Sequence, residues 1–225
     1  MILYIIRHGE TGWNAQGRLQ GCADIPLNEK GRQLARITGE VLKKVPFDLV
    51  ITSPLCRARE TGELIVAPSE KYFRRRIPVL EDDRIKEIAW GSWEGLGCTE
   101  RNFEIPDEKY NLFFTDALHF AGSPDGESVA DVCARTAEFL QEVIHNTEYE
   151  DKTILISTHG CAMRAMLQPF YENQQDFWQG HVPFNCTINV VESSKGTARL
   201  VQKDKIFYDA SLCTDNYKLV KNGDE

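Results

Sequence analysis

Two histidines follow apolar segments in the same local pattern. Residues 4–9 (YIIRHG) and 155–160 (LISTHG) each read as a short strand that ends in His-Gly. Ligands of an open parallel sheet bind beyond the carboxyl ends of its strands, so both histidines are expected to reach one crevice. The glycine after each histidine lets the backbone approach a ligand closely. His8 and His159 are therefore the first candidate site residues, although a lone histidine is more often structural.

Two arginines indicate the charge of the ligand. Arg57 follows a Ser53-Pro54 pair, which is typical of a helix start, and a cation there opposes the positive end of the helix dipole. Arg7 ends a segment that otherwise reads as buried, and a buried guanidinium needs a charged partner. Each arginine alone is consistent with a surface salt bridge. Together with the two histidines they predict a compact cationic pocket for a phosphate dianion, whose geometry suits guanidinium forks.

The elements that must position these residues are strands and helices in alternation. Three apolar runs lack polar alternation, as strands of a mainly parallel sheet do when both faces are covered, and they span 2–6, 49–51 and 154–156. Helical patterns follow at 29–44, from Ser53 to about Val66, and after a capping box formed by Ser128 and Asp131. The sequence therefore predicts a three-layer α/β/α fold with a mostly parallel central sheet.

Length and composition favour one domain spanning 1–225. Residues 96–124 fit the alternation least well, because they hold aromatic side chains among acidic ones. Two interpretations of this segment stay open: a partly helical flap that covers a pocket, or an ordinary insertion that packs on the body. An aromatic flap would favour an apolar or ring-bearing ligand group.

The charge balance limits the partners. Lys and Arg number 26 against 34 Asp and Glu, and the net charge of -8 opposes binding to nucleic acid or to an anionic membrane. No apolar run approaches the roughly 18 residues of a membrane span, and Arg7 interrupts the apolar start before a signal-peptide core. We therefore expect a cytoplasmic protein without nucleic-acid or membrane partners. A homodimer is left open.

Cysteine and histidine spacing gives no metal or disulfide pattern. The seven cysteines include no Cys-x-x-Cys pair, and their odd number argues against a disulfide framework, so reduced thiols are expected. The five histidines form neither His-x-His nor His-Glu-x-x-His, which disfavours a histidine-metal hydrolase. No metal site and no cofactor are predicted.

Four motifs in order resemble one family. They are RHGETGWN at 7–14, SPLCRA at 53–58, EIAWGSWEG at 87–95 and THG at 158–160. This set closely resembles the histidine phosphatase superfamily, on its phosphoglycerate mutase-like branch. The resemblance covers roughly 1–95 and 123–190, and it leaves out the 96–124 flap and the C-terminal tail. It implies the phosphoglycerate mutase-like version of the three-layer fold.

The resemblance assigns roles to the candidate residues. His8 would attack phosphorus and become phosphohistidine, while the phosphoryl oxygens would be held by Arg7, Arg57 and His159. Phosphoryl transfer depends mainly on positioning and electrostatic stabilisation, which fixed arginines and a donor histidine can supply without metal. The resemblance adds Asn14 as a further phosphate contact and Gln20 with Gly21 as a substrate-loop pair.

A leaving alkoxide also needs a proton, and the resemblance gives that role to Glu87. This carboxyl would have to stay protonated near pH 7 through burial beside the crevice, and it would then activate water. Glu10 and Glu94 are rival carboxylates. Glu10 lies in the nucleophile loop, however, and Glu94 lies in a Trp-Glu-Gly turn of structural character.

The resemblance is compatible with three functions: a hydrolase, a mutase and a non-catalytic binding module. A mutase must hold a second acidic group, and the sugar-acid mutases of this family carry extra Lys and Arg in the flap, whereas residues 96–124 hold two basic and five acidic side chains. The sequence therefore favours a metal-independent phosphomonoester hydrolase that acts on a small phosphorylated metabolite through phosphohistidine. The alternatives are mutase-type phosphoryl transfer and a non-catalytic phospho-ligand module on the same fold. Such modules tend to have lost the nucleophile or the acid, and both are present here.

Overall fold

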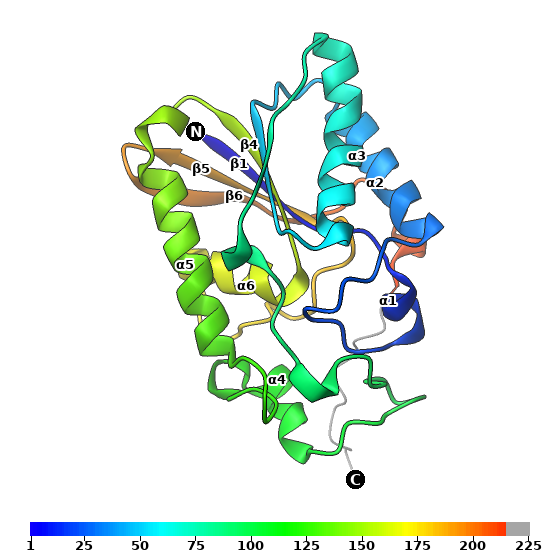
Figure 1. The fold of residues 1–225 in the computed structure, drawn as a ribbon. Coiled ribbons are helices and arrows are strands. Elements are labelled where there is room, and N and C mark those ends of the chain that lie inside the picture. Colours follow the sequence, from blue (N-terminus) through cyan, green and yellow to red (C-terminus); the bar gives the residue numbers. More distant parts are fainter. Residues whose placement is uncertain (215–225) are drawn as a thin grey trace.

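A mostly parallel sheet forms the centre of the protein, whose residues 1–214 are described by a computed structural model (Figure 1). Its six strands follow the order β3-β2-β4-β1-β5-β6. The parallel strands are β1 (Ile2–Arg7), β2 (Leu49–Thr52), β3 (Val79–Glu81) and β4 (Thr153–Thr158). The antiparallel strands β5 (Ile188–Ser194) and β6 (Thr197–Lys205) extend the sheet beyond β1. The prediction from the apolar runs is confirmed.

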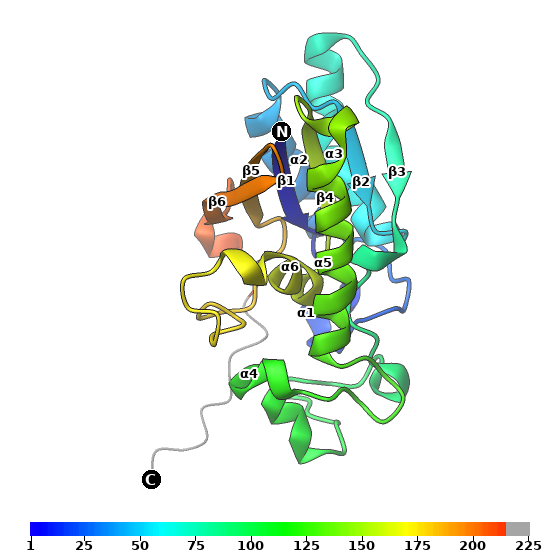
Figure 2. The ribbon, with the colours of Figure 1, turned by 90° about the vertical axis from the view of Figure 1, so that its left-hand side faces the viewer.

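Helices cover both faces of this sheet (Figure 2). One layer consists of α2 (Glu29–Leu42) and α3 (Cys56–Phe73), and the other of α5 (Val129–His145) and α6 (Gly160–Leu167). Ile6 packs in the core shared with α2 and α3, whereas its neighbour Ile5 packs in the core shared with α5 and α6. Because successive side chains of a strand point to opposite faces, an unbroken apolar run is what a doubly covered strand requires. The three-layer architecture is confirmed.

Helix α3 differs from the prediction at both ends. The N-cap position is Leu55 rather than Ser53, and the helix continues to Phe73. Ser53 is engaged elsewhere, because its Oγ lies 2.8 Å from Nε2 of His159. Pro68 lies inside the helix, where it costs about 3 kcal/mol. The residue after this proline makes a tertiary contact, because the hydroxyl of buried Ser69 donates to the Val45 carbonyl at 2.7 Å.

The other predicted helix starts agree with the structure. Asn28 caps α2 by accepting from the N–H of Gly31, although α2 ends at Leu42 rather than Lys44. Ser128 and Asp131 form the predicted capping box of α5. A short helix that was not predicted, α1 (Gly12–Gln16), follows His8 and has its own capping box.

The 96–124 segment lies beyond the carboxyl ends of the parallel strands (Figure 1). It contains α4 (Leu112–Thr115) between two short 3-10 turns. Phe113 is buried and packs edge-on against Trp90 and Trp178, with ring centroids 4.7 and 4.9 Å apart. The indole of Trp178 also donates to the Phe113 carbonyl at 2.5 Å. The segment is thus partly helical and is fixed against Trp90 and Trp178 by its aromatic residues.

All seven cysteines are free thiols. Within the described residues, none of the helices has both the length and the apolar character that crossing a membrane requires.

Candidate active site

His8 and His159 lie side by side because their strands are neighbours. β1 and β4 are parallel, with Arg7 opposite Thr158, so the next residue of each strand is a histidine at the same level. Their ring centroids are 5.1 Å apart. Both side chains are buried, His159 completely. The predicted meeting of the two strand ends is confirmed.

The imidazole of His8 is held as a neutral ring with a defined tautomer. Nδ1 lies 2.6 Å from the carbonyl oxygen of Gly9, and since a carbonyl only accepts, Nδ1 carries the proton. Burial, reinforced by the positive charges of Arg57 and Arg7, holds the pKa of His8 well below its usual value. The Nε2 atom therefore keeps an unprotonated lone pair, which is what a nucleophile needs.

His159 has one satisfied and one unsatisfied ring nitrogen. Nε2 lies 2.8 Å from Ser53 Oγ, whereas Nδ1 has no hydrogen-bond partner among the described residues. Burial, together with the charge of Arg57, also holds the pKa of His159 well below its usual value. Buried polar atoms normally have partners, so this nitrogen is suited to a ligand.

The lowered pKa values of His8 and His159 predict how the free energy of unfolding depends on pH. Below about pH 6.5 the histidines of the unfolded chain take up protons, whereas buried His8 and His159 stay neutral. The unfolded state then binds more protons, so the free energy of unfolding should fall with decreasing pH. The slope approaches about 1.4 kcal/mol per pH unit for each histidine.

Ring ¹⁵N chemical shifts recorded across a pH titration would measure the protonation of His8 and His159 directly. Exposed His119 is an internal control, because its hydrogen bond to Asp116 raises its pKa, and it should titrate above pH 6.5. Titration of His8 near pH 6.5 would contradict the neutral-nucleophile assignment.

Arg7 and Arg57 occupy different positions. Arg7 lines a cavity beside His8, and its Nη1 donates to the Pro183 carbonyl. Arg57 is fully buried and is not among the lining residues. Its Nη1 and Nη2 donate to the carbonyls of Ala23 and Gly21 at 2.8 and 2.6 Å. Gly21 is thus a backbone partner of Arg57 rather than part of the cavity wall.

Glu94 holds the loop that Arg57 contacts. Its carboxylate accepts from the successive N–H groups of residues 21–23 at 2.6–3.3 Å. Glu10 is bound by Asn28 at 2.8 Å and by Lys30 at 3.1 Å. Neither carboxylate lines the cavity. Within residues 1–214, no group of three or more His, Cys, Asp or Glu side chains is arranged to hold a metal ion.

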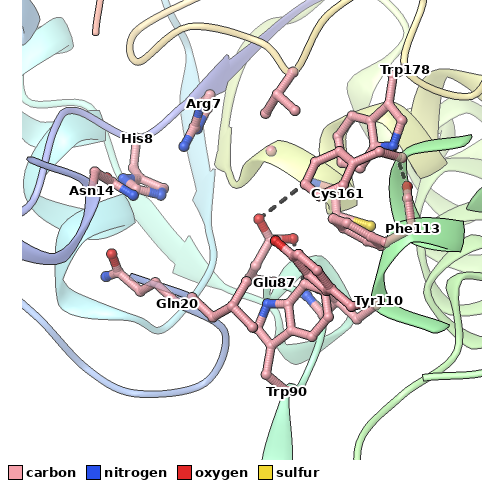
Figure 3. A pocket seen from close by; sticks show the side chains of 15 residues that line it. Arg7, His8, Asn14, Gln20, Glu87, Trp90, Tyr110, Phe113, Cys161 and Trp178 are labelled. Carbon is pink, nitrogen blue, oxygen red and sulfur yellow. Dashed lines mark hydrogen bonds between the residues drawn. The ribbon is translucent and has the colours of Figure 1, made fainter. Parts of the chain in front are cut away.

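Glu87 lines the same cavity as His8. Its Oε1 accepts from the N–H groups of Ile88 and Ala162 at 3.0 and 3.1 Å, and its Oε2 accepts from that of Cys161 at 3.2 Å. Each carboxylate oxygen has two lone pairs, so Oε2 keeps one free for a proton or a water. In Figure 3, Glu87 lies between the basic residues on one side and the aromatic rings on the other.

The cavity beside His8, called the His8 cavity below, encloses about 460 Å³ of empty space when the solvent at its open side is included. Asn14 and Gln20 lie on its polar side with Arg7 and His8, as Figure 3 shows. Its other side is formed mainly by rings, from Trp90, Tyr110, Phe113, Phe114 and Trp178. Among the described residues that line it, Arg7 is the one Lys or Arg. The structure thus brings together His8, Arg7, Asn14, Gln20 and Glu87 around this cavity. His159, whose ring lies beside that of His8, and Arg57 are not among its lining residues.

Some residues of the site were not predicted. Ser53 was interpreted as a helix cap, whereas it contacts His159. Asn185 donates to the His8 carbonyl at 3.0 Å, and Trp178 completes the aromatic side of the cavity. No local motif marks Asn185 or Trp178.

Comparison with known proteins identifies the family. Residues 3–205 match the histidine phosphatase superfamily (branch 1). The chain is 37% identical over 186 residues to the uncharacterized phosphatase PhoE of Bacillus subtilis (strain 168), covering 83% of this chain and 86% of that protein. It is 34% identical over 166 residues to 2,3-bisphosphoglycerate-dependent phosphoglycerate mutase 2 of Gloeobacter violaceus, covering 74% of each.

A solved structure agrees with this assignment. Bacillus stearothermophilus YhfR superposes with a TM-score of 0.78 at 32% identity, covering 91% of this chain and 97% of that one. The four motifs and the paired histidines described above lie within the matched region. The chain therefore belongs to the histidine phosphatase superfamily (branch 1), on its phosphoglycerate mutase-like side, and is an enzyme of that family.

Proposed function

We propose that the protein is a metal-independent phosphomonoester hydrolase that acts through a phosphohistidine at His8. The observation that carries this proposal is the state of His8: a neutral ring with Nδ1 bonded to Gly9, and with Nε2 available beside the charges of Arg7 and Arg57. Glu87 lines the same cavity, so a nucleophile and a proton donor serve one bound phosphate ester.

In the first step, Nε2 of His8 attacks phosphorus while the bond from phosphorus to the leaving oxygen breaks. Arg7, Asn14 and the unpartnered nitrogen of His159 stabilise the phosphoryl oxygens, and Arg57 adds positive charge from behind Gly21. Protonated Glu87 transfers its proton from Oε2 to the leaving oxygen.

In the second step, a water replaces the released alcohol. The Glu87 carboxylate takes a proton from this water as its oxygen attacks phosphorus, and the bond from phosphorus to Nε2 breaks. Inorganic phosphate leaves, His8 returns to its neutral form, and Glu87 again holds a proton. No external oxidant, reductant or cofactor is needed for this balance.

The wall of the His8 cavity favours hydrolysis of small phosphate esters with an apolar or ring-bearing leaving group. Rings such as Tyr110 and Phe114 offer stacking surface to that group. Among the described residues that line the cavity, a second phosphate or carboxylate would find Arg7 as the one Lys or Arg, and the proposed reaction already uses Arg7. Mutase-type transfer, suggested by the name of the Gloeobacter relative, is therefore the weaker candidate.

A panel of phosphate esters assayed in excess chelator tests this proposal. We expect phosphate release from naphthyl and phenyl phosphates to continue in chelator, because guanidinium groups supply the charge stabilisation. Release should exceed both hydrolysis and isomerisation of 3-phosphoglycerate. Complete loss of activity in chelator with rescue by one divalent ion would contradict the proposal, as would isomerisation that exceeds phosphate release.

A further inference from the structure

We propose that Arg135 is a positioning residue that fixes Glu87 for proton transfer, an inference that rests on the proposed function. Arg135 lies on α5 and does not line the His8 cavity, so it acts through another residue. Its Nη1 donates to the carbonyls of Arg84 and Lys86, both at 2.7 Å. Its Nη2 donates to the carbonyl of Glu87 itself at 3.0 Å.

The carboxylate of Glu127 completes this arrangement. It accepts from Nε of Arg135 at 2.8 Å and from Nη2 at 2.9 Å. It also accepts from the N–H of Ala89 at 3.0 Å. Arg135 and Glu127 therefore hold the backbone on both sides of Glu87. Arg135 binds the carbonyl of Glu87 and two carbonyls before it, and Glu127 binds the N–H of Ala89 after it. All five N–H donors of the Arg135 guanidinium are used, and the three donors of a lysine cannot reproduce this geometry.

The segment around Glu87 needs such external partners. Residues 86–90 lie in neither a helix nor a strand, so no regular element satisfies their backbone groups. The Glu87 side chain is itself held at the start of α6, by the N–H groups of Cys161 and Ala162. Arg135 fixes the backbone end of the same residue from α5. A displacement of about 1 Å at a reacting group can cost about 10²-fold in rate.

Arg84 provides a matched control. It connects the same loop to α5, through Glu138 and Glu142 at 3.1 and 2.7 Å. Its side-chain partners are carboxylates, with Asp82 as the third, and none of them is the backbone of Glu87. Loss of the Arg84 side-chain contacts removes ion pairs between this loop and α5, but it removes no hydrogen bond to Glu87.

Single-turnover kinetics of Arg135→Gln and Arg135→Lys test the inference. With an alkyl phosphate, transfer to His8 should slow by about 10–100-fold in both variants. With nitrophenyl phosphate, whose leaving group needs little proton assistance, it should change by less than about threefold. Arg84→Gln should show no such difference between the two substrates. Equal slowing of both substrates, or no slowing of either, would overturn the inference.

A double-mutant cycle separates positioning from general structural damage. In a Glu87→Gln background, Arg135→Lys should cause no further loss with the alkyl phosphate, because the residue it positions no longer donates a proton. A full additional loss there would overturn the inference and leave the proposed function intact. If Glu87→Gln alone shows no dependence on the leaving group, the proposed proton donor itself is wrong. The two failures are thus distinguishable.

Discussion

Replacing His8 with alanine is expected to reduce hydrolysis by on the order of 10⁶-fold, the scale seen when a catalytic nucleophile is removed. Without Nε2 the proposed phosphohistidine cannot form at this position, and the remaining charges can bind phosphate without transferring it. The rate of phosphate release from nitrophenyl phosphate, measured against the uncatalysed background, checks this result.

Two controls support that measurement. His145→Ala removes an exposed histidine of α5 and should leave the rate unchanged. His8→Ala should still bind vanadate, because Arg7, Arg57 and His159 remain. A His8→Ala protein that keeps even a hundredth of the wild-type rate would show that another group is the nucleophile.

Glu87→Gln is expected to separate substrates by leaving group. An alkyl phosphate expels a poor leaving group, so loss of the acid should slow its first transfer by roughly 10²–10⁴-fold. Nitrophenolate departs readily without a proton, so the same variant should transfer phosphate from nitrophenyl phosphate almost normally. Single-turnover kinetics are required, because slow hydrolysis of the phosphoenzyme would mask the difference in the steady state.

Equal losses with both substrates would assign Glu87 a binding or structural role. The rival carboxylates are already engaged in this structure: Glu94 accepts from the backbone of residues 21–23, and Glu10 is paired with Lys30. Glu94→Gln should therefore perturb both substrates alike, since it disturbs the loop that contacts Arg57.

The parts of this protein that follow from local sequence were the parts that could be predicted. The apolar runs in β1 and β4 reflect burial on both faces. A His-Gly pair at the end of such a strand lies at the carboxyl edge of the sheet, where ligands bind. The pairing of His8 with His159 therefore follows from the sequence alone. The capping box of Ser128 and Asp131 was equally local.

The remaining contacts depend on residues far apart in the chain. Ser53 precedes a proline, which is the pattern of a helix cap, but its partner is His159, at a strand end more than a hundred residues away. The carbonyls that hold Arg57 belong to a loop shaped by Glu94. The contact of Arg135 with Glu87 joins a helix to an irregular segment. No spacing rule connects such residues, because their contact depends on how separate elements pack.

Identification of the phosphorylated residue tests the central claim most directly. Rapid quenching of the enzyme with labelled nitrophenyl phosphate, followed by peptide mapping, should place an acid-labile, alkali-stable phosphate on His8. In Glu87→Gln, which should form the phosphoenzyme but hydrolyse it slowly, the label should approach one phosphate per chain. Label on any other residue, or nitrophenol release through many turnovers with no labelled histidine at any time, would contradict the account.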